Sequence, residues 1–166
     1  MLKGLTVKHW VGGVLILILS FTITLWLTEP EIPQLSRRAT INLAIMPHQI
    51  GAVVDGAAIA RAPADRAAYL LYGPYISLPA GSYAVDIAFV CTDNAAANVF
   101  DATAQAGKQV LAVARLEPGD PRCNGSNQTV TLPFVLKRAT DAVEFRTLFG
   151  GQGMLKVTSL VLWREQ

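Results

Sequence analysis

Few side chains in this sequence could do chemistry, and they lie far apart along the chain. The histidines are His9 and His48, and the cysteines are Cys91 and Cys123. A metal site needs several His, Cys or carboxylate ligands that converge, and the sequence has no Cys-x-x-Cys or His-x-x-x-His spacing. A Ser–His–acid triad would depend on His48, and no nucleophile-elbow motif accompanies it. We therefore expect no catalytic residue, no metal site and no cofactor, with His48 in a loop or packed.

Residues 150–153, Gly-Gly-Gln-Gly, form the one glycine-rich run. It is not a phosphate-binding loop, because no Gly-Lys-Ser/Thr follows it. It contains the Gly-Gly-Gln triplet of peptide release factors, but a hairpin in an exported domain is the wrong context for that activity. We expect a tight turn.

Tyr69, Tyr72 and Tyr75 are the one aromatic cluster near turns. Exposed rings at these positions would form a platform that stacks on a sugar or on a partner's side chain. Packing in the core or at its rim is the alternative interpretation. Farther along, Glu144 and Arg146 are two residues apart on one face of an expected strand, which favours a solvated or cross-strand charge pair.

Residues 10–28 are an apolar run without a charged side chain, and Trp10 and Trp26 lie near its ends. A helix that crosses the hydrocarbon core needs roughly 20 apolar residues. The two tryptophans would be about 24 Å apart along such a helix, which places one indole at each interface. The run therefore predicts an N-terminal transmembrane α-helix.

The flanking charges predict the orientation of this helix. Lys3 and Lys8 precede it and Glu29 and Glu31 follow it, so we expect a cytoplasmic N-terminus and an inner-membrane, single-pass protein with a periplasmic domain. A cleaved signal peptide is the competing interpretation, but the run is long and no Ala-x-Ala site follows. A buried soluble helix is the third.

The helix also carries small residues that could contact another membrane helix. These are Gly12, Gly13 and Ser20, and their spacing is not a full small-xxx-small repeat. A plain lipid-facing anchor is the alternative.

Composition divides the rest of the chain. We expect residues 1–9 in the cytoplasm, a linker with two prolines over 29–39, and one domain over 40–166. That domain is electrically neutral, so it lacks the basic stripe that nucleic-acid binding needs. Both cysteines lie in the predicted exported part, where a disulfide can persist. We favour a bridge between Cys91 and Cys123, with two separate buried thiols as the alternative.

Alternating polar and apolar residues predict short strands throughout the domain. We expect a helical turn or a loop over 57–68, a loop over 117–127, and a core face on the strand after Gly81 made by Tyr83, Val85, Ile87 and Phe89. About eight strands with frequent turns predict a mainly β fold, an antiparallel sandwich or barrel. The expected strands cover residues 40–45, 49–54, 69–90 with two turns, 99–106, 109–116, 129–136, 142–147 and 155–164.

The segment YGPYISLPAGSYAVDIAF and the downstream VEFRTLFGGQGMLKVTSLVLW resemble jelly-roll, carbohydrate-binding-module-like (galactose-binding-like) domains. The resemblance covers roughly residues 48–164 and implies a jelly-roll-type β-sandwich. Members of this class bind sugars through exposed aromatics and polar loop residues. The matching positions are Gly73, Pro74, Tyr75, Leu78, Pro79, Gly81 and Tyr83, then Glu144 and Arg146.

Two functions remain open, and neither is enzymatic. In the first, the chain is a non-catalytic accessory or scaffold subunit of an inner-membrane complex, for example photosynthetic or respiratory. Its partners would then be lipid and other integral membrane subunits. In the second, it is a membrane-anchored carbohydrate-binding module, as the resemblance implies. We expect the first.

Overall fold

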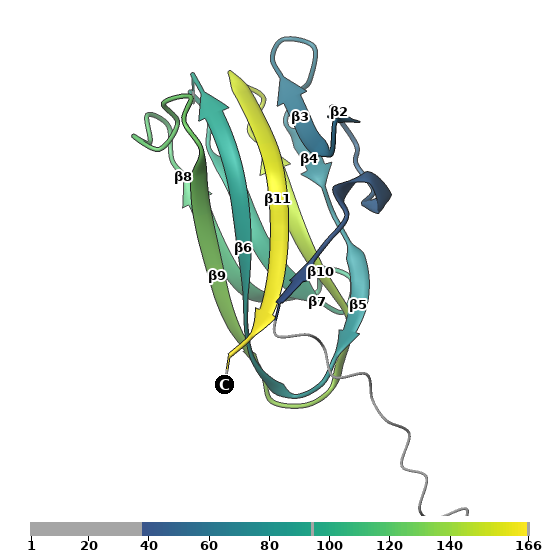
Figure 1. Ribbon diagram of the computed structural model, residues 1–166. Coiled ribbons are helices and arrows are strands. Elements are labelled where there is room, and N and C mark those ends of the chain that lie inside the picture. The colour runs from purple at the N-terminus through teal and green to yellow at the C-terminus, as the bar shows by residue number, and fades with distance from the viewer. Residues whose placement is uncertain (1–37, 94, 166) are drawn as a thin grey trace, which may run out of the picture. The chain divides into compact units, whose positions relative to one another are not determined.

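The computed structural model describes residues 38–93 and 95–165. These residues form two antiparallel sheets that lie face to face (Figure 1), so the predicted mainly β sandwich is confirmed. The predicted membrane helix 10–28, with Gly12, Gly13 and Ser20, and the linker up to residue 37 lie outside the described residues. Within the described residues, no helix is long and apolar enough to cross a membrane.

Eleven strands make up the two sheets of the described chain, where the sequence predicts about eight. The six-stranded sheet has the order β2-β3-β11-β6-β9, and β1 pairs with β11. The five-stranded sheet has the order β4-β10-β7-β8, and β5 also pairs with β10. The elements are β1 (Arg38–Thr40), η1 (Leu43–Ile45), β2 (Ala52–Val54), β3 (Ala57–Arg61), β4 (Ala68–Leu71), β5 (Pro74–Leu78), β6 (Gly81–Thr92), β7 (Asn98–Ala104), β8 (Gln109–Leu116), β9 (Gln128–Leu136), β10 (Thr140–Phe149) and β11 (Met154–Arg164).

The core lies between the sheets and is built by alternate residues of each strand. On β6 the predicted core face is confirmed, because Tyr83, Val85, Ile87 and Phe89 are all buried. The ring of Tyr83 stacks on Phe134 of β9, with 5.6 Å between ring centroids. Burying each such large apolar side chain contributes roughly 1.5–3 kcal/mol, which fixes the register of the strands and therefore what their outer faces present.

The strand predicted over 40–45 is wrong beyond its first residue. Strand β1 ends at Thr40, and a 3-10 turn follows at η1. The side chain of Asn42 accepts a hydrogen bond of 3.0 Å from the backbone N–H of Ala44. That local bond caps the turn and replaces the sheet ladder that an alternating pattern would otherwise favour.

The helical turn or loop predicted over 57–68 is wrong in its first part. Residues Ala57–Arg61 form β3, which pairs with β11. Alanine has little preference for a strand, but the small side chains of Ala58 and Ala60 are fully buried there. After β3 the chain turns, and Asp65 accepts hydrogen bonds from the backbone of Gly51 and Arg61.

Strand β10 organises the five-stranded sheet. It pairs with β7 on one side, and on the other with β5 along its first half and β4 along its last residues. Side chains from four strands therefore meet on the outer face of this sheet.

Candidate ligand-binding face

Strand alternation places the charged residues of β10 on the outer face of the five-stranded sheet. Val143 and Phe145 point into the core and are buried, so Glu144 and Arg146 point outward. On the neighbouring β7, Thr103 lies opposite Glu144, and Asp101 lies opposite Arg146. The register thus gathers four polar side chains outside an apolar core.

Arg146 and Asp101 form a two-bonded ion pair across the strands. Nε of Arg146 lies 2.8 Å from Oδ1 of Asp101, and Nη2 lies 2.7 Å from Oδ2. The guanidinium also lies over the ring of Tyr69, 5.2 Å from its centroid. The hydrogen bonds and charge of Asp101 raise the pKa of Arg146. The guanidinium of Arg146 is therefore fixed in orientation by the carboxylate of Asp101 and by the ring of Tyr69.

Glu144 is buried although it is on the outer face, with 3% of its surface exposed. Its Oε1 accepts a hydrogen bond of 3.1 Å from the hydroxyl of Thr103. The turn between β7 and β8 lies close to it, because a Cβ on Gly107 would come 3.3 Å from Oε1 of Glu144 and 2.7 Å from Nη1 of Arg146. Gly107 also has φ +82°. Glycine therefore fits this position both because it lacks a Cβ and because it adopts a positive φ easily.

Tyr75 is the exposed member of the cluster, at 45%. Its backbone has φ +63°, a conformation that bulky residues rarely adopt and that gathers at binding sites. Burial of its hydroxyl raises the pKa of Tyr75, and the charge of Glu144 and a hydrogen bond to it raise the pKa further. The phenol of Tyr75 therefore lies close to Glu144, while part of the ring remains open to solvent.

Tyr69 and Tyr72 complete the cluster as half-buried rings. Their centroids are 6.3 Å apart and their planes are tilted by 59°. The three tyrosines therefore lie beside one charged network, rather than in the core. We call this surface the tyrosine face: Tyr69, Tyr72, Tyr75, Asp101, Glu144 and Arg146.

Two exposed valines of β8 extend the same side of the sheet. Val113 is opposite Asp101 and is 53% exposed, and Val110 is opposite Thr103 and is 59% exposed. The face thus combines aromatic and apolar area with a few fixed polar groups.

The structure corrects the charge pair expected from Glu144 and Arg146. The ion-pair partner of Arg146 is Asp101, and Glu144 is buried instead of solvated. The sequence did not point to Asp101 and Thr103, because their partners Arg146 and Glu144 lie 45 and 41 residues away along the chain. The available signal was their alternation with the apolar residues of the strand predicted over 99–106.

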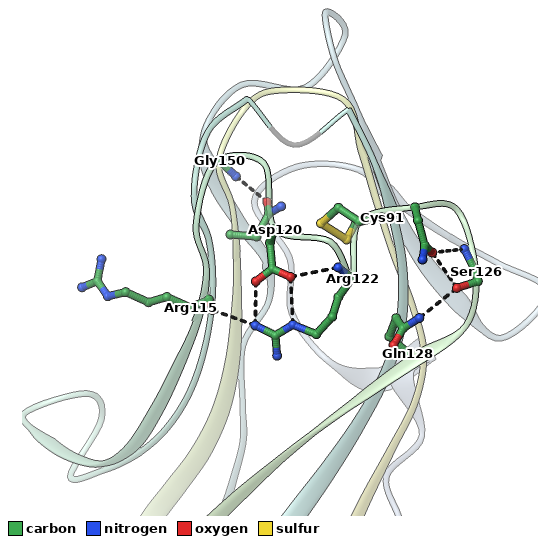
Figure 2. Close-up of a disulfide and its surroundings, with 10 residues drawn as sticks. Cys91, Arg115, Asp120, Arg122, Ser126, Gln128 and Gly150 are labelled. Atoms are coloured by element: carbon green, nitrogen blue, oxygen red, sulfur yellow. Dashed lines mark hydrogen bonds and ion pairs between the residues drawn. A yellow bond between two sulfur atoms is a disulfide. The ribbon is translucent and has the colours of Figure 1, made fainter.

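Cys91 of β6 and Cys123 of the predicted 117–127 loop form a disulfide at the end of the sandwich (Figure 2). The backbone N–H of Gly125 also donates to the carbonyl of Cys91, at 2.9 Å. In the same loop Arg122 forms an ion pair with the carboxylate of Asp120, with a shortest contact of 2.7 Å. It also donates a hydrogen bond to the carbonyl of Arg115 (Figure 2). These contacts fix a loop that contains no regular secondary structure.

His48 and residues 150–153 lie in connections between elements. His48 is exposed in the loop before β2. Residues 150–153 connect β10 to β11, and a Cβ on Gly153 would collide with the carbonyl oxygen of Thr92. Among the described residues, no three His, Cys, Asp or Glu side chains gather in a way that could hold a metal ion.

No family model and no curated protein matches the chain. Three solved structures to which the chain is similar are carbohydrate-binding modules, each with a TM-score of 0.48. One is the C-terminal CBM6 of a marine laminarinase from Zobellia galactanivorans, at 12% identity, covering 76% of this chain and 99% of that one. Another is a CBM6 module from Cellvibrio mixtus lichenase 5A in complex with cellotriose, at 13% identity, covering 77% of this chain and 98% of that one. The third is the xylan-binding module CBM15, at 9% identity, covering 78% of this chain and 97% of that one. These are likenesses of fold alone.

Proposed function

We propose that the chain is a membrane-anchored, non-catalytic carbohydrate-binding protein that holds a sugar on the tyrosine face. The observation that carries this proposal is Tyr75, a half-open ring in a rarely used backbone conformation beside a fixed charge network. A sugar ring presents apolar C–H groups on one side and hydroxyls at its rim. An aromatic ring flanked by oriented charged groups is complementary to both.

The charges of the face favour a neutral sugar. Asp101 and Glu144 outnumber Arg146, and Arg146 is already paired with Asp101. An acidic polysaccharide would therefore meet two carboxylates and one already paired cation among the six residues of this face. A neutral sugar can use the carboxylate oxygens as acceptors and the guanidinium as a donor.

In the proposed non-catalytic role, both carboxylates of the face are oriented by hydrogen bonds from the chain. Asp101 accepts two hydrogen bonds from Arg146, and Glu144 accepts one from Thr103. Such groups are oriented for recognition.

The accessory-subunit function is a second candidate, favoured by the exposed valines. Val110 and Val113 lie next to the tyrosine face, and adjacent exposed apolar side chains are typical of protein contacts. In this candidate the predicted helix 10–28 packs on neighbouring helices. The chain would then co-purify in mild detergent with larger membrane proteins, and deletion of residues 10–28 would abolish the association.

Binding to polysaccharides tests the carbohydrate proposal. The full chain, purified in mild detergent, is incubated with immobilised β-linked glucans, xylan and starch, and the bound fraction is measured. Tyr75→Ala should weaken binding about tenfold, which is about 1.4 kcal/mol, because it removes the stacking ring. Tyr75→Phe keeps the ring and should retain most of the affinity.

Trp163→Ala is the matched aromatic deletion on the outer face of the other sheet. Trp163 is half-buried on β11 and donates a hydrogen bond to Asp86, away from the tyrosine face. It should leave binding unchanged. Binding that survives Tyr75→Ala but is lost in Trp163→Ala would place the ligand on the wrong sheet for this proposal, and no binding to any polysaccharide would reject it.

A further inference from the structure

One end of the sandwich gathers five basic side chains from four separate segments. All five are exposed. We call this set the basic end: Arg38, Lys108, Lys137, Arg138 and Arg164.

Strand register and side-chain contacts bring these residues together. Arg38 begins β1 opposite Trp163, whose ring it covers at 5.8 Å, and Arg164 is the next residue on β11. Arg164 donates to the carbonyl of Ala80 in the β5–β6 turn, at 2.8 Å. Gly81 after that turn lies opposite Leu136, the last residue of β9.

The remaining basic residues follow from β9 onward. Lys137 and Arg138 form the connection from β9 to β10, next to Leu136. Lys108 is in the β7–β8 turn, whose Gln105 donates its backbone N–H to the carbonyl of Asp141 at the start of β10. In Figure 1 the β5–β6 connection, the β9–β10 connection and the end of β11 all lie at the same end of the sandwich.

Among the described residues, the acidic side chains at this end are fewer than the basic ones. Asp141 and Glu165 lie there, against five basic residues. At the opposite end, the loops balance their charges: Arg122 is paired with Asp120, and Asp65 lies in the same turn as Arg66. The positive excess is therefore confined to one end of a domain whose overall charge is near neutral.

The chain also enters the domain at the basic end, because β1 starts at Arg38. In the sequence, the charge-free apolar run 10–28 precedes Arg38 by only nine residues. Nine residues span at most about 30 Å when fully extended. A bilayer that held the apolar run would therefore be within reach of these five cations.

We propose that the basic end docks on the anionic headgroups of the bilayer that holds residues 10–28. Clustered Lys and Arg side chains next to a membrane anchor are attracted by anionic phospholipid within about a Debye length. Docking orients the domain, so that the end with the Cys91–Cys123 disulfide points away from the lipid. Docking on the membrane is separate from carbohydrate binding and does not depend on it.

Energy transfer from two positions of the full chain to labelled lipid tests this orientation. The full chain carries one dye at Ala139→Cys, in the β9–β10 connection, or at Ala64→Cys, in the β3–β4 connection at the opposite end. Both alanines are exposed. Each protein is reconstituted in vesicles of phosphatidylcholine alone or with about 30% phosphatidylglycerol, with an acceptor on the headgroups.

Transfer from position 139 should exceed transfer from position 64 and should rise with phosphatidylglycerol. In about 0.5 M NaCl, where the Debye length is about 4 Å, this rise should disappear. Lys137→Glu with Arg138→Glu should abolish it, whereas Arg66→Glu, a charge reversal at the opposite end, should leave it unchanged. Transfer from position 139 that is the same in both lipids, or a rise that survives the double charge reversal, would overturn the proposal.

Discussion

Arg146 and Asp101 are 45 residues apart in the sequence, yet they form two parallel hydrogen bonds of 2.8 and 2.7 Å on the outer face of the five-stranded sheet. Neither residue contributes to the apolar core between the sheets. Their pairing holds Arg146 over Tyr69 and sets the polar frame in which Tyr75 and Glu144 lie. The tyrosine face is therefore an ordered surface before any ligand arrives, which reduces the entropic cost of binding.

Removing one member of this pair should destabilise the fold. Asp101→Asn or Arg146→Met should each lower the free energy of unfolding by about 2 kcal/mol, between the values typical of exposed and fully buried pairs. The double variant should cost less than the sum, because either change alone already removes the pair. Urea unfolding of the four proteins gives the coupling energy. A coupling of zero would show that the ion pair contributes nothing.

The hydroxyl of Tyr75 should resist ionisation in alkaline solution. Burial, and then Glu144, raise the pKa of Tyr75 above its ordinary value of 10.0. The folded state therefore favours the neutral phenol, and stability should be lost as the pH rises above about 10. Ultraviolet titration of tyrosinate should show one late-titrating phenol that is absent in Tyr75→Phe.

Glu144→Gln tests the cause of that shift. It removes the negative charge, so the late titration should move toward lower pH. Glu165→Gln makes the same chemical change at an exposed position away from the tyrosine face and should leave the titration where it was. An unchanged titration in Glu144→Gln would mean that burial alone is responsible.

Asp120 should add to acid sensitivity. The hydrogen bonds from Arg122 lower the pKa of Asp120 below its ordinary value of 3.8. Its contribution to stability is therefore complete above about pH 4 and is lost as the pH falls through the depressed folded-state pKa. Arg122→Gln should make the stability of the protein less dependent on pH in this range. Thermal unfolding followed across acidic pH measures the slope, and equal slopes in both proteins would contradict the role of the pair.

Opening the disulfide should cost more than any of these changes. Cys91 and Cys123 are 32 residues apart. Closing a loop of this length lowers the entropy of the unfolded chain, which raises the free energy of unfolding by about 3–4 kcal/mol. The variant Cys91→Ala with Cys123→Ser should unfold at correspondingly lower urea. A reductant should destabilise the parent protein and leave the variant unaffected. Equal stability of the parent with and without reductant would show that the bridge does not constrain the unfolded state.

Long alternating segments of the fold were predictable from the sequence, and short ones were not. In β6 and β9 large apolar residues recur at every second position, so the core face follows from the pattern alone. Strand β3 carries alanines, whose burial depends on how closely β11 and the opposite sheet approach. The alternating pattern also failed to predict where β1 ends. A single hydrogen bond to the side chain of Asn42 forms a turn there, although the pattern continues in the sequence.

The residues of the candidate face were predictable from the sequence except for Asp101, but the ion pair that joins them was not. Tyr69, Tyr72 and Tyr75 lie close together in the sequence, so local spacing already grouped them. Asp101 joins them only through the register of β7 on β10, which no local pattern encodes. For the same reason Arg146 was assigned to its sequence neighbour Glu144 and not to its partner across the sheet.

Hydrogen–deuterium exchange of the full chain with a bound polysaccharide tests the central claim most directly, because it locates the ligand without a substitution. We expect slower exchange in β4, β5 and β10, the strands that carry the tyrosines, Glu144 and Arg146, and unchanged exchange in the 117–127 loop. Protection confined to that loop or to β9 and β11 of the other sheet would contradict it.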